Sequence, residues 1–149
     1  MLRRPLYLLL ILSVFSVAAA GCGAAPAAGN SAAGGLAMAD MAQMPAEVQA
    51  APVTVREAYQ FAFANPDVLQ KLPCYCGCGK MGHTSNYSCY VQGKDAAGAI
   101  QYDSHALGCS ICVDITQDAM RLLREGKPIP EIRIYVDATY AKYGPSNMP

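Results

Sequence analysis

Hydrophobic residues recur with helical spacing in four stretches beyond residue 53, and each stretch predicts a helix. The first begins at a T-x-x-E capping box formed by Thr54 and Glu57 and ends near Asn65. A short helix is expected over residues 67–72, because Asn65 and the following Pro form an N-cap and a first helical position. The third starts near Ser110 and stops at Gly126, and the last runs from Pro130 to Gly144-Pro145. The predicted apolar faces are Val55, Ala58, Tyr59, Ala62 and Phe63; then Ile111, Ile115, Ala119 and Leu122; then Ile132, Tyr135, Val136, Tyr140 and Tyr143.

A two-residue alternation of apolar and polar positions interrupts the helical pattern in the middle of the chain. Residues 87–91 alternate in this way, and residues 100–102 are a candidate partner strand across a Gly-containing turn. The predicted fold class is therefore mainly α: a small helical domain of about four helices around a Cys/His-rich loop, with room for one short β-hairpin.

The first residues form a signal rather than a structural element. MLRR is a basic start, an apolar run follows, and small residues lead to Cys22, so residues 1–21 are predicted to be a secretory signal peptide. The segment from Ala19 to Cys22 resembles a bacterial lipobox, in which the Cys is acylated. The alternative is an ordinary signal peptide with Cys22 left as a free thiol. The favoured prediction is a lipid-anchored protein on the extracytoplasmic face of the cell membrane.

Residues 22–53 are rich in Ala, Gly, Pro and Ser and contain no aromatic residue. Such a composition buries too little apolar surface to order itself, so this stretch is predicted to be a flexible tether, with the folded domain at 54–149. Met38, Met41 and Met44 recur at every third position, and their soft thioethers suit Cu(I). A role as apolar filler or as a short helix is favoured over that weak copper site.

Charge argues against one class of partner. Eleven basic residues balance eleven acidic ones, and no basic run is present. Nucleic acid requires a clustered positive surface, so no nucleic acid is expected as a partner.

Six thiols and two imidazoles lie between residues 74 and 112, and Cys22 is the single Cys elsewhere in the sequence. Their order is C-x-C-x-C, a His, a further Cys, and then H-x-x-x-C-x-x-C. Such soft donors suit Cu(I) or Zn(II), and their number is enough for two four-coordinate sites or for one thiolate cluster. The candidate metal ligands are Cys74, Cys76, Cys78, His83, Cys89, His105, Cys109 and Cys112.

The spacing of the first three Cys residues disfavours disulfides between them. In an extended segment Cys74, Cys76 and Cys78 share one face, and a bridge between positions two apart is strained. Cys109 and Cys112 precede a predicted helix, whose N-terminus stabilises thiolate. Thiolate both binds metal and attacks disulfides, so this pair is compatible with both functions.

The residues PCYCGCG at 73–79, GH at 82–83 and GCSICVDI at 108–115, followed by EGKPIPEIRIYVDATY, resemble the PCYCGC-motif lipoproteins. This is a bacterial family without a settled biochemical role. The resemblance covers about residues 55–143 and implies an extracytoplasmic lipoprotein with the Cys cluster as its functional centre. It supplies no mechanism.

Three functions fit the sequence, and the first is favoured. It is binding of Cu(I) or Zn(II) through the thiolate cluster, either for capture and delivery, with a metal-donor or acceptor protein as partner, or as structural sites. The second is a disulfide-stapled interaction module, since six thiols is an even number in an exported protein. The third is a thiol-disulfide oxidoreductase that uses Cys109 and Cys112. The favoured function is not enzymatic, and no catalytic residue is predicted.

Overall fold

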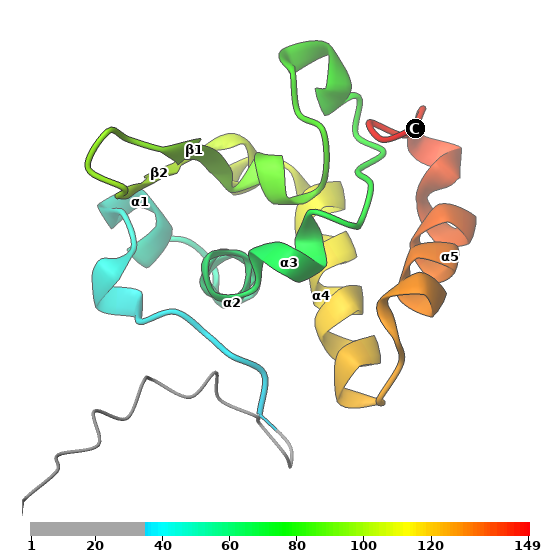
Figure 1. Ribbon diagram of the computed structural model, residues 1–149, viewed down its shortest axis with the longest axis horizontal. Coiled ribbons are helices and arrows are strands. Elements are labelled where there is room, and N and C mark those ends of the chain that lie inside the picture. Colours follow the sequence, from blue (N-terminus) through cyan, green and yellow to red (C-terminus); the bar gives the residue numbers. More distant parts are fainter. Residues whose placement is uncertain (1–34) are drawn as a thin grey trace, which may run out of the picture. The chain divides into compact units, whose positions relative to one another are not determined.

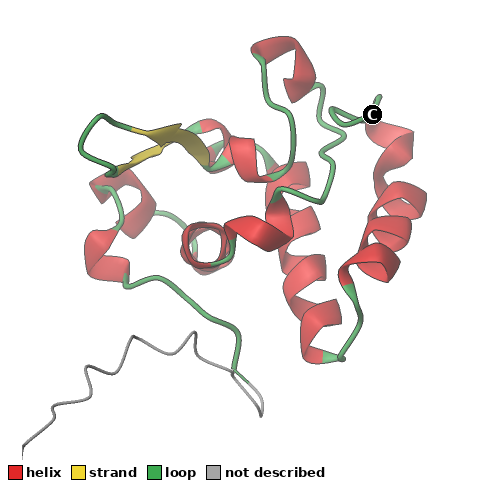
Figure 2. Cartoon of the chain, in the orientation of Figure 1, coloured by secondary structure: helices red, strands yellow, loops and turns green. Residues whose placement is uncertain are grey.

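The structure, a computed structural model, describes residues 35–149. The predicted signal peptide, Cys22 and the first part of the predicted tether lie outside the described residues. Helices dominate the described part, and one two-stranded hairpin accompanies them (Figure 2). This arrangement confirms the predicted fold class. No helix within 35–149 has the length and apolarity needed to cross a membrane.

Three longer helices form the scaffold: α2 (Val53–Ala64), α4 (Ser110–Arg124) and α5 (Ile129–Tyr140). Helix α4 packs against both α2 and α5, and α5 runs beside it (Figure 1). The apolar stripe of α4 supplies the centre of the core, and the buried members of the three helices are Ala58, Tyr59, Phe61, Ala62, Val113, Ile115, Ala119, Met120, Leu122, Ile132, Val136 and Tyr140. Tyr143, expected on the buried face of the last helix, is instead 55% exposed, because it lies past the end of α5 in the 3-10 turn η5 (Ala141–Tyr143).

The first predicted helix forms, but its predicted capping box does not. The N-cap of α2 is Pro52, and Thr54 lies inside the helix. The Glu57 carboxylate accepts a hydrogen bond from the Gln117 side chain of α4 at 3.4 Å. Glu57 therefore contributes to the contact between α2 and α4 and does not cap α2. The short helix α3 (Pro66–Leu69) follows with Asn65 as its N-cap position, as predicted, but it ends three residues before the predicted end at residue 72.

Ordered structure begins before residue 54, which corrects the predicted domain boundary. A 3-10 turn, η1 (Met41–Gln43), and helix α1 (Ala46–Gln49) precede α2, and α1 packs against it. Met44 and Val48 are buried in the core. These two apolar side chains outweigh the polar composition around them, and the burial of Met44 favours a packing role for the Met triplet.

The hairpin consists of β1 (Val91–Lys94) and β2 (Ile100–Tyr102), paired antiparallel with an irregularity after Val91. The predicted second strand is confirmed, whereas the first begins at the end of the predicted range. Tyr87–Cys89 instead form a 3-10 turn, η3. The η3 turn directs the side chain of Cys89 into the interior, where it is buried.

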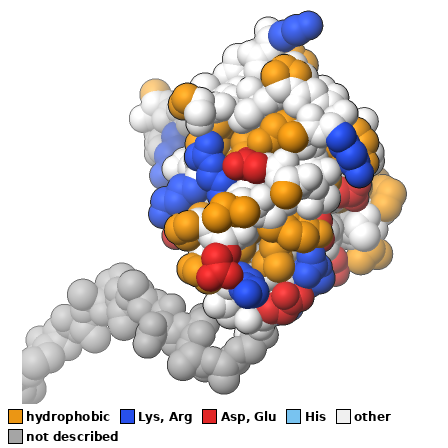
Figure 3. All heavy atoms as spheres, turned by 90° about the vertical axis from the view of Figure 1, so that its right-hand side faces the viewer, with side chains coloured by type: hydrophobic (Ala, Val, Ile, Leu, Met, Phe, Trp, Pro, Cys, Tyr) orange, Lys and Arg blue, Asp and Glu red, His pale blue; other side chains and the backbone are white. Residues whose placement is uncertain are grey.

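The Cys-rich loop connects α3 to β1 and lies over the N-terminal end of α4. The C-terminal segment runs beside this loop, at the upper right of Figure 1. The Asn147 N–H donates to the Cys74 carbonyl at 3.1 Å, which joins two segments 73 positions apart. The face of the molecule that Figure 3 shows mixes acidic, basic and hydrophobic side chains without a single-sign patch.

Candidate metal centre

Three sulfur atoms form a nearly equilateral triangle at the centre of the cluster. The Sγ atoms of Cys74 and Cys76 are 3.5 Å apart, those of Cys74 and Cys112 are 3.5 Å apart, and those of Cys76 and Cys112 are 3.6 Å apart. Metal–sulfur bonds of about 2.3 Å in a tetrahedron separate the sulfurs by about 3.8 Å, so these three sulfurs are packed as closely as thiolates in a metal site. All six Cys residues of the described part are free thiols.

A turn at Gly77 places the side chain of Cys78 next to that of Cys89, a contact that the predicted extended segment does not give. Gly77 has φ +86°, a left-handed conformation that a side chain would disfavour. The chain therefore turns into the 3-10 helix η2 (Cys78–Met81), and the Sγ of Cys78 lies 3.7 Å from that of Cys89. The predicted extended segment therefore ends at Gly77, but the Sγ atoms of Cys74, Cys76 and Cys78 still converge to within 4.8 Å of one another.

Helix α4 places the C-x-x-C pair as the sequence predicts. Cys109 is its N-cap residue and Cys112 lies in its first turn, with the two Sγ atoms 2.9 Å apart. The hydrogen bond from the Cys112 thiol lowers the pKa of Cys109 to about 6. Cys109 is therefore a thiolate at neutral pH, which is the form that binds a soft metal.

The other thiols of the triangle have unequal pKa values. Hydrogen bonding from Cys112 holds the pKa of Cys74 far below its usual range, whereas burial raises that of Cys76 to about 12. Cys112 has three sulfur neighbours but only one proton to donate. A cation satisfies several such sulfurs at once, so the packing of these thiols favours metal over protons.

The two histidines complete the donor set and lie next to each other. Their rings are edge to face, with centroids 5.1 Å apart. The Nε2 atom of His105 lies 3.4 Å from the Sγ of Cys76. His83 has only 9% of its side chain exposed, and its Nε2 is 3.6 Å from the Asp103 carboxylate. Its other nitrogen, Nδ1, is buried and has no hydrogen-bond partner.

Every predicted metal ligand of the described part belongs to at least one group of donors that lie within 4.8 Å of one another. The groups are Cys76, His105, Cys109 and Cys112; Cys78, His83, Cys89 and His105; Cys74, Cys76 and Cys78; and Cys74, Cys89 and Cys112. Two of these groups have four members, which is the number that a closed zinc site needs. The cluster can therefore hold metal, and its geometry does not name the ion.

A buried polar network that the sequence did not reveal fixes the backbone of Cys112. Its carbonyl accepts hydrogen bonds from the Tyr90 hydroxyl at 2.8 Å and from the Asn86 side chain at 3.3 Å. Thr116 bonds both Asn86 and Tyr90 at 2.8 Å, and all three side chains are fully buried. The network holds the first turn of α4 against the loop, so Tyr90 supports the cluster through the backbone of Cys112.

The C-terminal segment supplies a second support that sequence reasoning missed. The Asn147 side chain accepts a hydrogen bond from the Cys74 N–H at 2.7 Å and donates to the Ser85 carbonyl at 3.1 Å. Its amide nitrogen also lies 3.6 Å from the Sγ of Cys78. A single Asn in a polar tail carries no sequence signal for this role.

Asp103 is the third residue that the sequence did not single out. One carboxylate oxygen faces His83, and the other accepts a hydrogen bond from the His105 N–H at 2.8 Å. Its position two residues before His105 was an available signal, because Asp side chains often bond the backbone two residues on.

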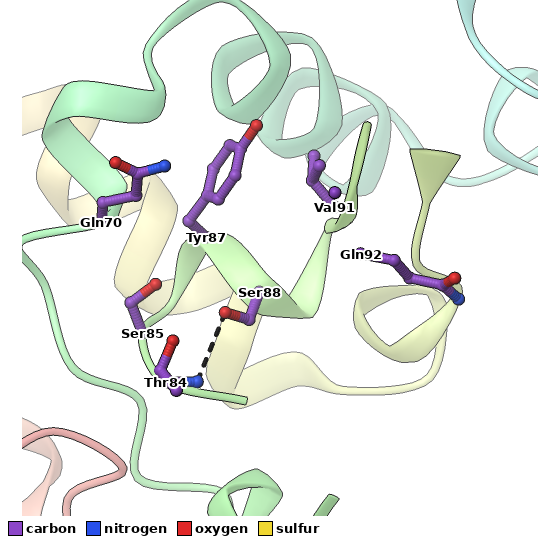
Figure 4. A pocket seen from close by; sticks show the side chains of 8 residues that line it. Gln70, Thr84, Ser85, Tyr87, Ser88, Val91 and Gln92 are labelled. Carbon is purple, nitrogen blue, oxygen red and sulfur yellow. Dashed lines mark hydrogen bonds between the residues drawn. The ribbon is translucent and has the colours of Figure 1, made fainter. Parts of the chain in front are cut away.

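Two surface pockets reach the cluster and a third does not. Cys109 lines a pocket of about 330 Å³ between α2 and the start of α4, and His83 and Asp103 line one of about 440 Å³ on the other side of the loop. The polar pocket drawn in Figure 4, of about 320 Å³, is lined by residues such as Thr84 and Ser88 and contains none of the donors. The cluster therefore borders one surface pocket at Cys109 and another at His83.

Comparison with protein families gives one match. The family model described as a protein of unknown function with PCYCGC motif matches residues 11–149, and the motif itself is Pro73 to Cys78. Neither the curated proteins nor the solved structures contain a match to this chain.

Proposed function

The chain belongs to the family of proteins of unknown function with a PCYCGC motif, and we propose that it binds a soft transition metal, Cu(I) or Zn(II), in its Cys/His cluster. The observation that carries this proposal is the convergence of all eight predicted donors, taken from residues 74–89 and 105–112, into overlapping groups within 4.8 Å. A chance collection of free thiols would not also bring both histidines to the same place.

The proposed setting is the extracytoplasmic face of the cell membrane, with the acylated Cys22 as anchor. The basic and apolar start of the sequence and the small residues before Cys22 support this setting. With Cu(I) the cluster would capture the ion and deliver it to an acceptor protein. With Zn(II) it would hold the small domain together. The proposed role is binding and not catalysis.

A second candidate function is thiol-disulfide exchange through Cys109 and Cys112. The short 2.9 Å separation of their sulfurs and the pKa of about 6 at Cys109 favour it. Against it, Cys112 is buried and also lies in contact with Cys74 and Cys76, which a metal site explains and a redox pair does not. The disulfide-stapled module is less favoured because all six thiols are free in the described part.

The experiment is metal analysis combined with thiol counting on the full chain, expressed with export and purified in detergent without added reductant. We expect at least one copper or zinc ion per chain, with the thiols reacting only after the metal is removed. The matched control carries Ser in place of all six Cys residues of the cluster and should bind no metal. A chain without metal and six protons lighter than its reduced mass would contradict the proposal and favour disulfides.

The oxidoreductase candidate is tested by insulin reduction. Turnover that disappears in both Cys109→Ser and Cys112→Ser, but persists in Cys78→Ser, would place exchange chemistry above metal binding. We expect no turnover in any of these proteins.

A further inference from the structure

The donors of the cluster separate into two sets at opposite ends. Cys76, Cys109, Cys112 and His105 form one group, three members of which come from α4 or the turn just before it. Cys78, Cys89 and His83 all come from the loop between α3 and β1 and belong to another group. No Cys is shared between these two four-membered groups, and His105 is the single residue common to both.

The first set is complete without any donor from the second. Three sulfurs and one imidazole nitrogen lie within 4.8 Å of one another, which is a Cys₃His set of the kind that closed tetrahedral zinc sites use. The ring of His105 contacts Cys76 through Nε2 at 3.4 Å, and its backbone is held by Asp103. The four protein ligands that one ion at this end would need are therefore already in place.

The second set contains a buried side-chain nitrogen that lacks a hydrogen-bond partner. His83 Nδ1 is fully enclosed and bonds nothing, although leaving such an atom unpaired costs about 1–3 kcal/mol. His83 lies in one donor group with the paired sulfurs of Cys78 and Cys89. A metal ion at this end accounts for the unpaired nitrogen and uses the lone pair that no hydrogen bond occupies.

Asp103 prepares this nitrogen for that role. Its carboxylate faces Nε2 of His83, so the ring proton belongs on Nε2 and the lone pair is left on Nδ1. A carboxylate behind the imidazole is the common arrangement at metal-binding histidines. Asp103 is thus a positioning residue that acts through His83, and through its other oxygen it also orders the backbone of His105.

Cys74 lies between the two sets and supplies the fourth ligand of the second. Its Sγ is 3.5 Å from Cys76 and Cys112 of the first set, and it is also within 4.8 Å of Cys78 and Cys89 of the second. With His105 assigned to the first set, Cys74 is the remaining thiol that the second set needs. The 3.5 Å contact between the Sγ atoms of Cys74 and Cys112 places the two sets of ligands next to each other.

We propose that the cluster is a two-metal centre, with one ion held by Cys76, Cys109, Cys112 and His105 and a neighbouring ion held by Cys74, Cys78, Cys89 and His83. This inference rests on the proposed function and adds the number of ions and the division of the ligands. The eight donors are used once each. Asp103 affects the affinity for the second ion, because its carboxylate faces the imidazole of His83, whereas at His105 it contacts the backbone N–H.

The test counts ions by native mass spectrometry on the full chain, reduced, stripped of metal and titrated anaerobically with Zn(II). We expect two zinc ions per wild-type chain. His83→Gln and Cys89→Ser should each bind one ion, Cys109→Ser should bind one, and the double variant His83→Gln/Cys109→Ser should bind none. Circular dichroism at each step identifies variants that fail to fold, and the wild-type count decides the question without them.

Asp103→Asn provides a finer test, because it keeps every ligand. We expect two ions at saturation but a 10–100-fold weaker affinity for one of them, as is usual when the partner of a metal-binding His is changed. Asp67→Asn, which removes an exposed carboxylate in the first turn of α3, is the matched control and should leave both affinities unchanged.

The outcomes separate this inference from the proposed function. One zinc ion per wild-type chain, or loss of both ions from every folded single variant, would overturn the division into two sites while metal binding stands. An unchanged pair of affinities in Asp103→Asn would overturn the role of Asp103. No bound zinc or copper in the wild type would overturn the proposed function as well.

Discussion

The α4 end and the loop end of the cluster are built in different ways. At the α4 end, Cys109 and Cys112 lie on a 15-residue helix whose other side packs between α2 and α5. At the loop end, Cys78 and Cys89 lie in two short 3-10 turns of four and three residues. A glycine turn and a residue of the C-terminal tail hold those turns in place. The helix therefore presents its donors through its own packing, whereas the loop depends on distant contacts and, under the proposed function, on the metal.

The largest effect should follow from removing the metal. Amide hydrogen exchange in residues 73–90 should then accelerate by about 1,000-fold, which corresponds to the roughly 4 kcal/mol that a ligand at 1,000 times its Kd contributes. Residues 113–124 of α4 should change much less, since packing protects them. Hydrogen exchange with mass spectrometry of the metal-loaded and stripped protein measures both. Equal acceleration in the two regions would contradict the expected difference between the loop end and the α4 end.

Thiol reactivity should differ about 100-fold between two partly exposed cysteines of the stripped protein. At pH 7 a pKa of about 6 leaves Cys109 mostly thiolate, whereas a pKa of about 12 leaves Cys76 about one part in 10⁵ thiolate. The weaker nucleophilicity of the more acidic thiol offsets about 1,000-fold of that difference. Alkylation by iodoacetamide, followed by peptide mass spectrometry, measures the ratio. The rate at Cys109 should fall about tenfold per pH unit below pH 6, as the thiolate is protonated, and a rate independent of pH there would contradict the predicted pKa.

Two substitutions should separate the supports of the two ends. Asn147→Ala should weaken metal binding by roughly 10–100-fold with little loss of global stability, because Asn147 holds only the loop. Tyr90→Phe should do the reverse and lower the free energy of unfolding by about 1–3 kcal/mol, because it removes a buried hydroxyl partner of Cys112 and Thr116. Zinc titration and denaturant unfolding measure the two quantities.

The matched control for the tail substitution is Ser146→Ala, whose hydroxyl hydrogen-bonds the backbone of Met148. It should change neither quantity. If Asn147→Ala lowered global stability as much as Tyr90→Phe, the loop would be part of the same cooperative unit as the helices.

The smallest effect is expected for a pair of glycines, one from each end. Gly77→Ala forces a side chain into a left-handed backbone conformation and should cost about 1–2 kcal/mol, mostly as lost zinc affinity of the loop. Gly108→Ala, just before α4, has φ −110° and open space around the added carbon, and should cost less than about 0.5 kcal/mol. Zinc titration and thermal unfolding of both variants test the difference. Equal costs would show that the turn at Gly77 does not limit the loop.

The sequence predicted the α4 end well because its signals are local. A C-x-x-C followed by an apolar stripe and a stopping Gly specifies both the helix and the position of its thiols, and α4 forms at those residues. The identity of all eight donors was also predictable from composition, because nearly every Cys and His of the chain lies in one short window.

The loop end was harder to predict because its determinants are distant in sequence or conformational. The pairing of Cys78 with Cys89 depends on the left-handed Gly77, and a Gly in a C-x-C-x-C run is equally compatible with an extended strand. Asn147 acts across 73 positions, and no local pattern marks it. Met44 and Val48 were assigned to a tether because a short apolar pair in a polar stretch does not reveal that it packs against a helix.

The contact between Asn147 and the loop has a practical consequence for handling the protein. Asn147 lies in the segment after α5 and bonds the loop, so that segment and the loop-end ligands are mechanically joined. An affinity tag or a reporter domain fused after Pro149 would pull on the segment that positions Cys74 and Cys78. Truncation of the chain before Asn147 would remove this contact without removing a single ligand. Metal counts obtained from C-terminally tagged or clipped samples would then report the fusion or the trimming, and an N-terminal purification handle is the appropriate choice.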